Sequence, residues 1–151
     1  EITDAVAEDS VSFLPDLLGT GTTDKKVAVH HALDGSFAIR KGDWKLIFSP
    51  DSGGWNEPKP KKTPERWQTD ELFQLHNLAL DPGETKNVWK QHPEMMETLA
   101  KAMGDIAQSG RTTRGTPQPN NVKHPNGKVI GDVMFPEVYV ERFPELGIRK
   151  N

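Results

Sequence analysis

Short apolar stretches separated by turn signals mark the first half of the chain. At 36–40, small or polar side chains alternate with apolar ones, which is the period of a half-buried β-strand. Asp34-Gly35 precedes this stretch, and Lys41-Gly42-Asp43 follows it, so a tight antiparallel turn is expected before the next stretch. The pattern predicts strands at 26–31, 36–40, 44–48 and 71–75. The expected core residues of this region are Phe37, Ile39, Trp44 and Ile47.

Apolar residues three or four positions apart predict one long helix in the second half. His92-Pro93-Glu94 opens the helix, Gly110 ends it, and one face must cover the sheet. A shorter helix is expected within 11–18, because Pro15 is tolerated only in a first turn. Near the C-terminus, Val138–Glu141 alternates and is a possible edge strand. The periodic apolar residues of the long helix are Met96, Leu99, Met103 and Ile106.

Charge and composition exclude several classes of partner. The 22 acidic and 19 basic residues give a formal net charge of -3, so a general electrostatic grip on nucleic acid or membrane is not expected. The chain also lacks the basic and apolar segments of a leader and any run of about 18 apolar residues. We therefore expect a soluble chain, whose export signal, if it has one, lies upstream of residue 1. Any anion binding must be local.

Complete catalytic sets are missing from the sequence. The chain has no cysteine, no HExxH, and no serine in the GxSxG frame of a strained nucleophile turn. Its histidines stand at 30, 31, 76, 92 and 124, without a paired acidic cluster. Gly19–Gly21 and Ser52–Gly54 lack the context of a phosphate-binding loop and are predicted to be turns. No catalytic residue and no metal ligand is therefore predicted in this chain.

Six strings, in order, resemble the C-terminal part of bacterial type I sulfatases, within the alkaline-phosphatase-like superfamily. Together they cover about residues 9 to 121, and the long second string carries much of the weight. They are Asp9 to Gly19 (DSVSFLPDLLG), His30 to Ile47 (HHALDGSFAIRKGDWKLI), Ser52 to Trp55 (SGGW), Glu71 to Leu75 (ELFQL), Asp81 to Asn87 (DPGETKN) and Gly110 to Thr112 (GRT).

This resemblance implies an α+β fold, in which a small four-stranded antiparallel sheet packs against one long C-terminal helix, with long loops. Residues 1–121 would form the sulfatase subdomain and 122–151 a tail. The subdomain would dock on an N-terminal catalytic domain that carries formylglycine and calcium. The motif that matures to formylglycine, (C/S)-x-P-x-R, is absent from this chain. A periplasmic or secreted location is implied in the same way.

The resemblance also suggests three substrate-binding residues. The position of His31, with His30 as the alternative, would touch the substrate or the leaving-group oxygen, for which a neutral-pH imidazole donor is suited. Successive side chains of a strand alternate, so only one of the two histidines can face a given pocket. The plainer alternative is a histidine hydrogen-bonded at a strand end. Ala32 stands where family members often have Ser, and a hydroxyl contact is lost there.

Trp55 is the third candidate, on a loop that could face a carbohydrate. Its indole would stack on a sugar while nearby cations meet sulfate groups. The alternative is a solvated loop with one tryptophan folded back. Arg111 and Arg114 could contact the catalytic domain or simply follow the helix C-terminus. The other residues of the candidate loop are Lys59, Lys61, Lys62, Arg66 and Trp67.

Three functions remain open on the sequence alone. The first is the C-terminal portion of a sulfatase that hydrolyses sulfate esters, with a sulfated carbohydrate or an aryl sulfate as substrate. The second is a stand-alone module that binds sulfated glycans, and the third is a structural cap. No nucleic acid or membrane partner is expected in any of them.

Overall fold

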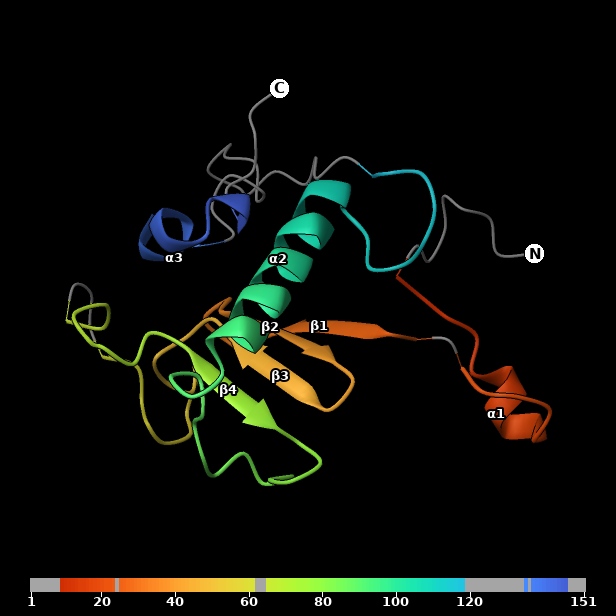
Figure 1. Ribbon diagram of the computed structural model, residues 1–151, viewed down its shortest axis with the longest axis horizontal. Coiled ribbons are helices and arrows are strands. Elements are labelled where there is room, and N and C mark those ends of the chain that lie inside the picture. The colour runs from red at the N-terminus through yellow and green to blue at the C-terminus, as the bar shows by residue number, and fades with distance from the viewer. Residues whose placement is uncertain (1–8, 24, 62–64, 119–134, 136, 147–151) are drawn as a thin grey trace.

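Four strands form one antiparallel sheet, in which neighbours along the chain are neighbours in the sheet (Figure 1). The computed structural model describes residues 9–23, 25–61, 65–118, 135 and 137–146. Val29, Ile39, Leu46 and Leu75 lie side by side across the four strands and give one face its apolar centre. The strands are β1 (Val27–His31), β2 (Phe37–Lys41), β3 (Trp44–Ile47) and β4 (Gln74–Asn77).

The predicted strands match β1 to β3 closely, and β4 begins later than predicted. Gly42 has φ +60°, which lets a two-residue turn join Lys41 to its partner Trp44. The predicted fourth strand starts at Glu71, but β4 starts at Gln74. The carboxylate of Glu71 instead accepts a hydrogen bond from the Trp89 indole at 2.8 Å, outside the strand.

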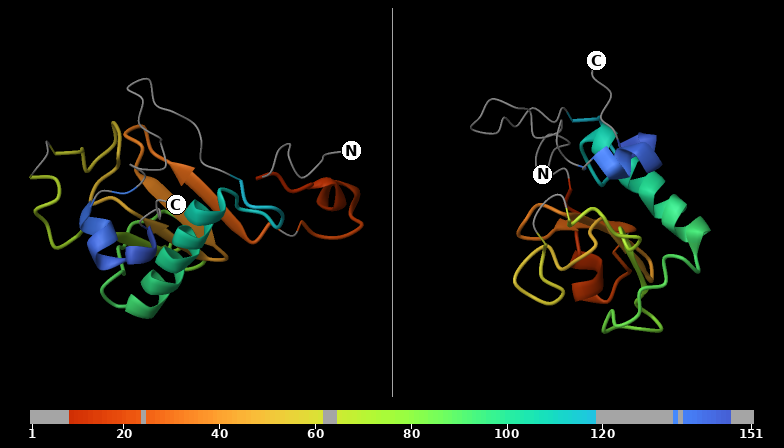
Figure 2. Two further views of the ribbon diagram at one scale, coloured as in Figure 1. Left: turned by 90° about the horizontal axis from the view of Figure 1, so that it is seen from above. Right: turned by 90° about the vertical axis from the view of Figure 1, so that its left-hand side faces the viewer.

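The long helix α2 (Pro93–Ser109) crosses one face of the sheet (Figures 1 and 2). Gly110 caps it at φ +66°, and the Gly110 N–H donates to the Ile106 carbonyl. Met96, Leu99 and Met103 are buried in one core cluster with sheet residues such as Ile39, Leu46 and Leu75. Of the predicted core residues Ile39 is fully buried, while Phe37, Trp44 and Ile47 are partly buried. The predicted α+β class is therefore confirmed.

The predicted edge strand at Val138–Glu141 is wrong, because these residues belong to the helix α3 (Glu137–Arg142). Tyr139 and Phe143 are both buried, four residues apart, and the Tyr139 hydroxyl donates to the Leu72 carbonyl at 2.8 Å. A 3₁₀ turn, η2 (Pro144–Leu146), follows, and the backbone of Glu145 lies directly over Gly104 of α2. The boundary predicted between residues 121 and 122 lies outside the described residues.

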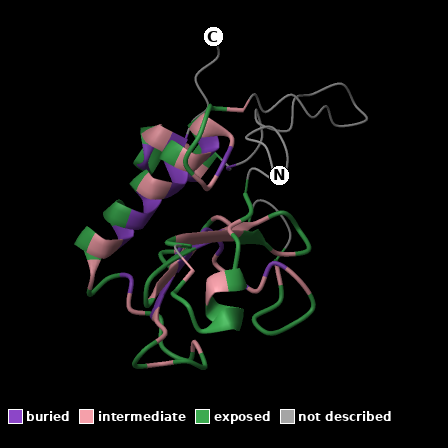
Figure 3. Cartoon of the chain, turned by 90° about the vertical axis from the view of Figure 1, so that its right-hand side faces the viewer, coloured by how far each residue is buried: buried purple, intermediate pink, exposed green. Residues whose placement is uncertain are grey.

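The first helix, α1 (Leu14–Leu18), stands apart from the sheet and α2 (Figures 1 and 2). Figure 3 shows it exposed or partly exposed throughout, and none of its residues is buried. Gly19 ends it at φ +64°, as expected for a C-terminal glycine. Its large apolar side chains face solvent in this chain: Phe13, which precedes it, and Leu14, Leu17 and Leu18.

Candidate functional site

Two loops far apart in the sequence form one surface at the end of β1. The turn between β1 and β2 contacts the Ser52–Trp55 loop, and we call residues 31–36 and 51–55 together the paired loops. The Asp34 N–H donates to the Gly53 carbonyl at 3.0 Å. A Cβ on Gly53 would lie 2.5 Å from the Cβ of Ala32, and Gly53 has φ +62°. Only glycine permits this close approach.

The guanidinium of Arg66 links the two paired loops through Asp34, Ser36 and Asp51. It donates to the Asp51 carboxylate at 2.8 Å from both Nε and Nη2, and Nη2 lies 2.5 Å from Asp34 Oδ2. The same Nη2 donates to the hydroxyls of Ser49 at 3.0 Å and Ser36 at 3.3 Å. Arg66 was one of the loop cations that could meet sulfate groups, but in the structure its Nε and Nη2 donate to protein oxygens.

This cluster also shifts the titration of Asp34. Partial burial acts to raise the pKa of Asp34, but it is outweighed by hydrogen bonds from the Ser36 N–H and hydroxyl and from Arg66, and by the charge of Arg66. The pKa of Asp34 is consequently lowered. Asp34 is thus ionised at neutral pH, in a cluster that joins the segments at 34–36, 49–51 and 66.

His31 and His30 lie on opposite faces of β1, as alternation along a strand requires. His31 is exposed, its Nδ1 lies 3.0 Å from the Ala32 carbonyl oxygen, and its ring meets the Phe37 ring edge-on. His30 pairs with Ala38 on the other face. There, partial burial and the charge of Lys45 lower the pKa of His30, against the opposing effect of Glu84. Of the two, only His31 belongs to the paired loops.

Trp55 points into solvent from the tip of the paired loops. Its side chain is 85% exposed, and Leu33 on the neighbouring turn is 69% exposed. Trp67 is folded back, with its ring 5.7 Å from that of Tyr139 and the guanidinium of Arg66 4.7 Å above it. The Nζ of Lys59 lies 3.8 Å from Oε1 of Glu57. Lys62, another cation of the candidate loop, lies outside the described residues.

Neither a metal cluster nor a spanning helix occurs in the part of the chain that the structure describes. No three His, Cys, Asp or Glu side chains gather there closely enough to hold a metal ion. None of the described helices has the length and apolar content needed to cross a bilayer.

Comparison with known proteins relates the chain to one enzyme class. An N-acetylgalactosamine-6-O-sulfatase of Bacteroides thetaiotaomicron is 35% identical over 105 residues, which are 66% of this chain. This chain is a relative of the bacterial sulfatases. The recognition of a sulfatase C-terminal subdomain from the six strings is confirmed. The chain spans about a fifth (19%) of the length of this curated relative.

A solved sulfatase structure is also similar to this chain. It is a Bacteroides thetaiotaomicron sulfatase from work on the metabolism of multiple glycosaminoglycans, 30% identical with a TM-score of 0.51. The match covers 70% of this chain and 21% of that one. No family model matches the chain.

The Arg66 cluster is the part of the site that sequence reasoning missed. Its members come from three separated segments. The local sequence around Asp34, Ser49 or Asp51 does not predict that these side chains contact Arg66. The Asp34-Gly35 turn and the glycines at 53 and 54 were the available signals, and they mark two turns without showing that the turns touch. The roles of His31, His30 and Trp55 in substrate binding stay predictions.

Proposed function

We propose that this chain is the C-terminal part of a sulfatase that acts on a sulfated carbohydrate, and that the paired loops form part of its substrate surface. The observation that carries the proposal is the exposure of Trp55, 85%, on a loop fixed by Gly53 and the Arg66 cluster. Exposed apolar patches mark binding sites, and Leu33, which is 69% exposed on the neighbouring turn, extends the apolar surface at Trp55. The names of both relatives, a hexosamine sulfatase and a glycosaminoglycan-metabolising sulfatase, support a sugar as that partner.

Each side chain of the proposed surface has a distinct chemical task. The indole of Trp55 stacks on the C–H face of a sugar ring, with Leu33 extending the apolar contact. The exposed imidazole of His31 donates a hydrogen bond to a hydroxyl or sulfate oxygen. His30 is the alternative donor, and its lowered pKa favours the neutral ring at physiological pH. In this proposal the chain positions the substrate and takes no part in the chemical step.

The chemical step belongs, in this proposal, to a catalytic domain that precedes the chain. That domain supplies the formylglycine nucleophile and the calcium site, for which this sequence has no motif. Two observations support such a partner: the chain spans 19% of its curated relative, and α1 holds Leu14, Leu17 and Leu18 in solvent. We propose that this apolar face of α1 packs on the catalytic domain, and that the whole enzyme is periplasmic or secreted.

The test is an NMR titration of the chain with a chondroitin sulfate oligosaccharide. We expect the indole N–H signal of Trp55 and the imidazole signals of His31 to shift on binding. The indole of Trp89 provides an internal reference, because it is 8% exposed and donates to Glu71. Trp55→Ala should abolish the shift at His31, whereas Leu80→Ala, which removes another exposed side chain, should retain it.

Each outcome of this titration separates the open functions. If Trp55 and His31 do not shift at any ligand concentration, the substrate surface is refuted and a structural cap remains. The mass of the native protein in its source cells then distinguishes an enzyme part from a stand-alone module. We expect a product several times heavier than 16.8 kDa. A product of 16.8 kDa would instead favour the stand-alone module.

A further inference from the structure

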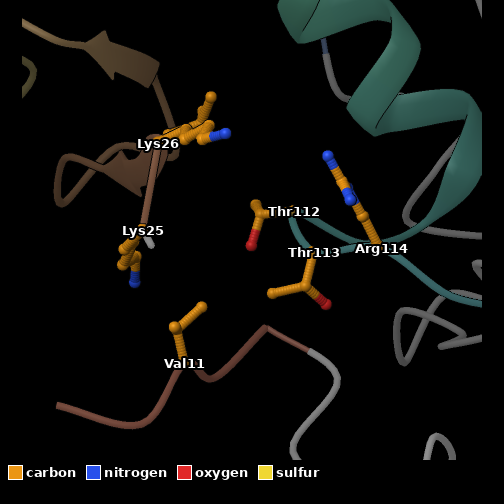
Figure 4. Close-up of a pocket in the computed structure, with 7 residues that line it drawn as sticks. Val11, Lys25, Lys26, Thr112, Thr113 and Arg114 are labelled. Carbon is orange, nitrogen blue, oxygen red and sulfur yellow. The ribbon is translucent and has the colours of Figure 1, made fainter. Parts of the chain in front are cut away.

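The two ends of β1 have different surroundings. At its start, the segment that leads into β1 and the loop after α2 border a cavity of about 240 Å³, toward which Lys26 and Arg114 extend (Figure 4). At its end, where the paired loops begin, the neighbours include aromatic rings from the C-terminal part of the chain. We use the name C-terminal segment for Phe135 and residues 137–146, which include α3 and η2.

One series of contacts joins the C-terminal segment to the Arg66 cluster. The ring of Tyr139 lies 5.7 Å from that of Trp67, at an interplanar angle of 84°. The guanidinium of Arg66 lies over the same indole, 4.7 Å from its centre, and binds Asp51 and Asp34. Burial raises the pKa of Tyr139 and the charge of Arg66 acts to lower it, so the hydroxyl lies within electrostatic reach of the cluster.

A second series of rings leads from the C-terminal segment to His31. The ring of Phe135 lies 5.5 Å from that of Phe37, and the Phe37 ring meets His31 edge-on at 6.3 Å. Phe135 also lies 5.1 Å from Phe48, the residue before Ser49 of the Arg66 cluster. The C-terminal segment is therefore connected both to a proposed ligand contact and to the side chains that hold the two loops together.

The C-terminal segment is itself held on α2 and on the loop before β4 (Figures 1 and 2). A Cβ on Gly104 would lie 2.6 Å from the Glu145 carbonyl oxygen, so the backbone of η2 passes directly over the helix. The Gln108 side-chain amide donates to the same carbonyl at 3.1 Å. At the other end, the Tyr139 hydroxyl donates to the Leu72 carbonyl at 2.8 Å. These contacts fix the position of the Tyr139 ring.

We propose that the C-terminal segment positions the substrate surface of the paired loops, with Tyr139 and Trp67 as positioning residues that act through Arg66. This inference rests on the proposed function, because it assumes that the paired loops bind the substrate. Trp67 is partly buried and lies outside any helix or strand, so its contact with Tyr139 restricts the indole. The indole in turn restricts the guanidinium that links both loops. A surface formed before the ligand arrives loses less entropy on binding.

NMR spectroscopy of the ligand-free chain tests the link through Trp67. Trp67→Leu removes the ring beneath Arg66, and the Arg66 Nε–H should then exchange with water roughly tenfold faster. The pKa of Asp34 should rise toward its ordinary value, because the hydrogen bond and the charge of Arg66 help to lower it. Trp67→Phe keeps a ring and should retain both signals. Leu99→Val trims the same core cluster at α2 without removing a ring, and it should change neither.

A substitution on α2 tests the same role from a distance. Gly104→Leu displaces the backbone of Glu145, while leucine has a higher helix propensity than glycine. The exchange of the Arg66 Nε–H and the pKa of Asp34 should change in the same direction as in Trp67→Leu. Glu97→Leu places the same side chain on the exposed side of α2 and is the matched control. The positioning role is overturned if Arg66 and Asp34 respond to Trp67→Leu no more than to Leu99→Val.

A titration with a chondroitin sulfate oligosaccharide connects this role to binding. Trp67→Leu and Gly104→Leu should each weaken the affinity roughly fivefold, because the loops must then be ordered by the ligand. Trp67→Phe and Glu97→Leu should bind like the unaltered chain. Equal affinity of all variants would overturn the positioning role and leave the proposed function standing. No binding by the unaltered chain would overturn both, so the two failures are distinguishable.

Discussion

The side chain of Arg66 shows how a charged residue in a lysine-rich loop can become an internal anchor. Its guanidinium side chain is 12% exposed and faces Asp34 and Asp51, which are 23% and 7% exposed. Its replacement would leave two carboxylates partly buried near each other without their cation. We expect Arg66→Met to lower the free energy of unfolding by about 3 kcal/mol.

Urea denaturation measures this loss, and the same loop offers a control. Lys61 is exposed, so Lys61→Met should change the free energy of unfolding by less than about 0.5 kcal/mol. The pH dependence gives a second signature. Because the pKa of Asp34 is lowered, its stabilisation is complete above about pH 4 and declines as the pH falls through the folded-state pKa. Arg66→Met should weaken this acid dependence. Equal stability of the two variants would contradict the anchor.

The titration of His30 tests the electrostatics of the second sheet face. Burial and Lys45 lower the pKa of His30, and Glu84 raises it. Lys45→Gln removes a positive charge, so the protonated ring becomes easier to form and the pKa of His30 should rise. Glu84→Gln should lower it, because a favourable negative charge is lost. NMR titration of the imidazole signals measures both. Shifts of the opposite sign would show that His30 senses other charges.

At the scale of elements, local signals account for most of what the sequence predicted. The period of 36–40, the turn at Gly42 and the spacing from Met96 to Met103 depend on neighbouring residues, and β2, β3 and α2 occur as predicted. Val138–Glu141 alternates like a strand but is helical, because Tyr139 and Phe143 share one buried side. The decisive contact, from Tyr139 to Leu72, joins residues 67 positions apart. Local pattern does not contain such information.

The helix α1 should contribute almost nothing to the stability of the chain by itself. Leu17 is 69% exposed, whereas Leu99 of α2 is fully buried in the core. Leu17→Ala should change the free energy of unfolding by less than about 0.5 kcal/mol, and Leu99→Ala should lower it by about 2–5 kcal/mol. Thermal or urea denaturation distinguishes them. A loss at Leu17 as large as that at Leu99 would mean that α1 packs within this chain.

At the scale of the whole molecule, the described residues share one core, whereas the sequence lacks the motif for formylglycine. The sheet, α2 and α3 share one apolar cluster, while the motif for formylglycine is absent. We therefore expect the chain alone to release no sulfate from an aryl sulfate or from a chondroitin sulfate oligosaccharide. Ion chromatography measures the released sulfate, with the N-acetylgalactosamine-6-O-sulfatase relative as the positive control. Release above the uncatalysed rate would place a nucleophile in this sequence.

Binding affinity tests the central claim, the substrate surface on the paired loops, most directly. Isothermal titration calorimetry would compare the chain, Trp55→Ala and Leu80→Ala with a chondroitin sulfate oligosaccharide. The loss of a stacked, exposed indole should weaken binding roughly tenfold or more, and Leu80→Ala should bind like the unaltered chain. Equal affinity of all three, or no binding by any, would contradict a carbohydrate surface at Trp55.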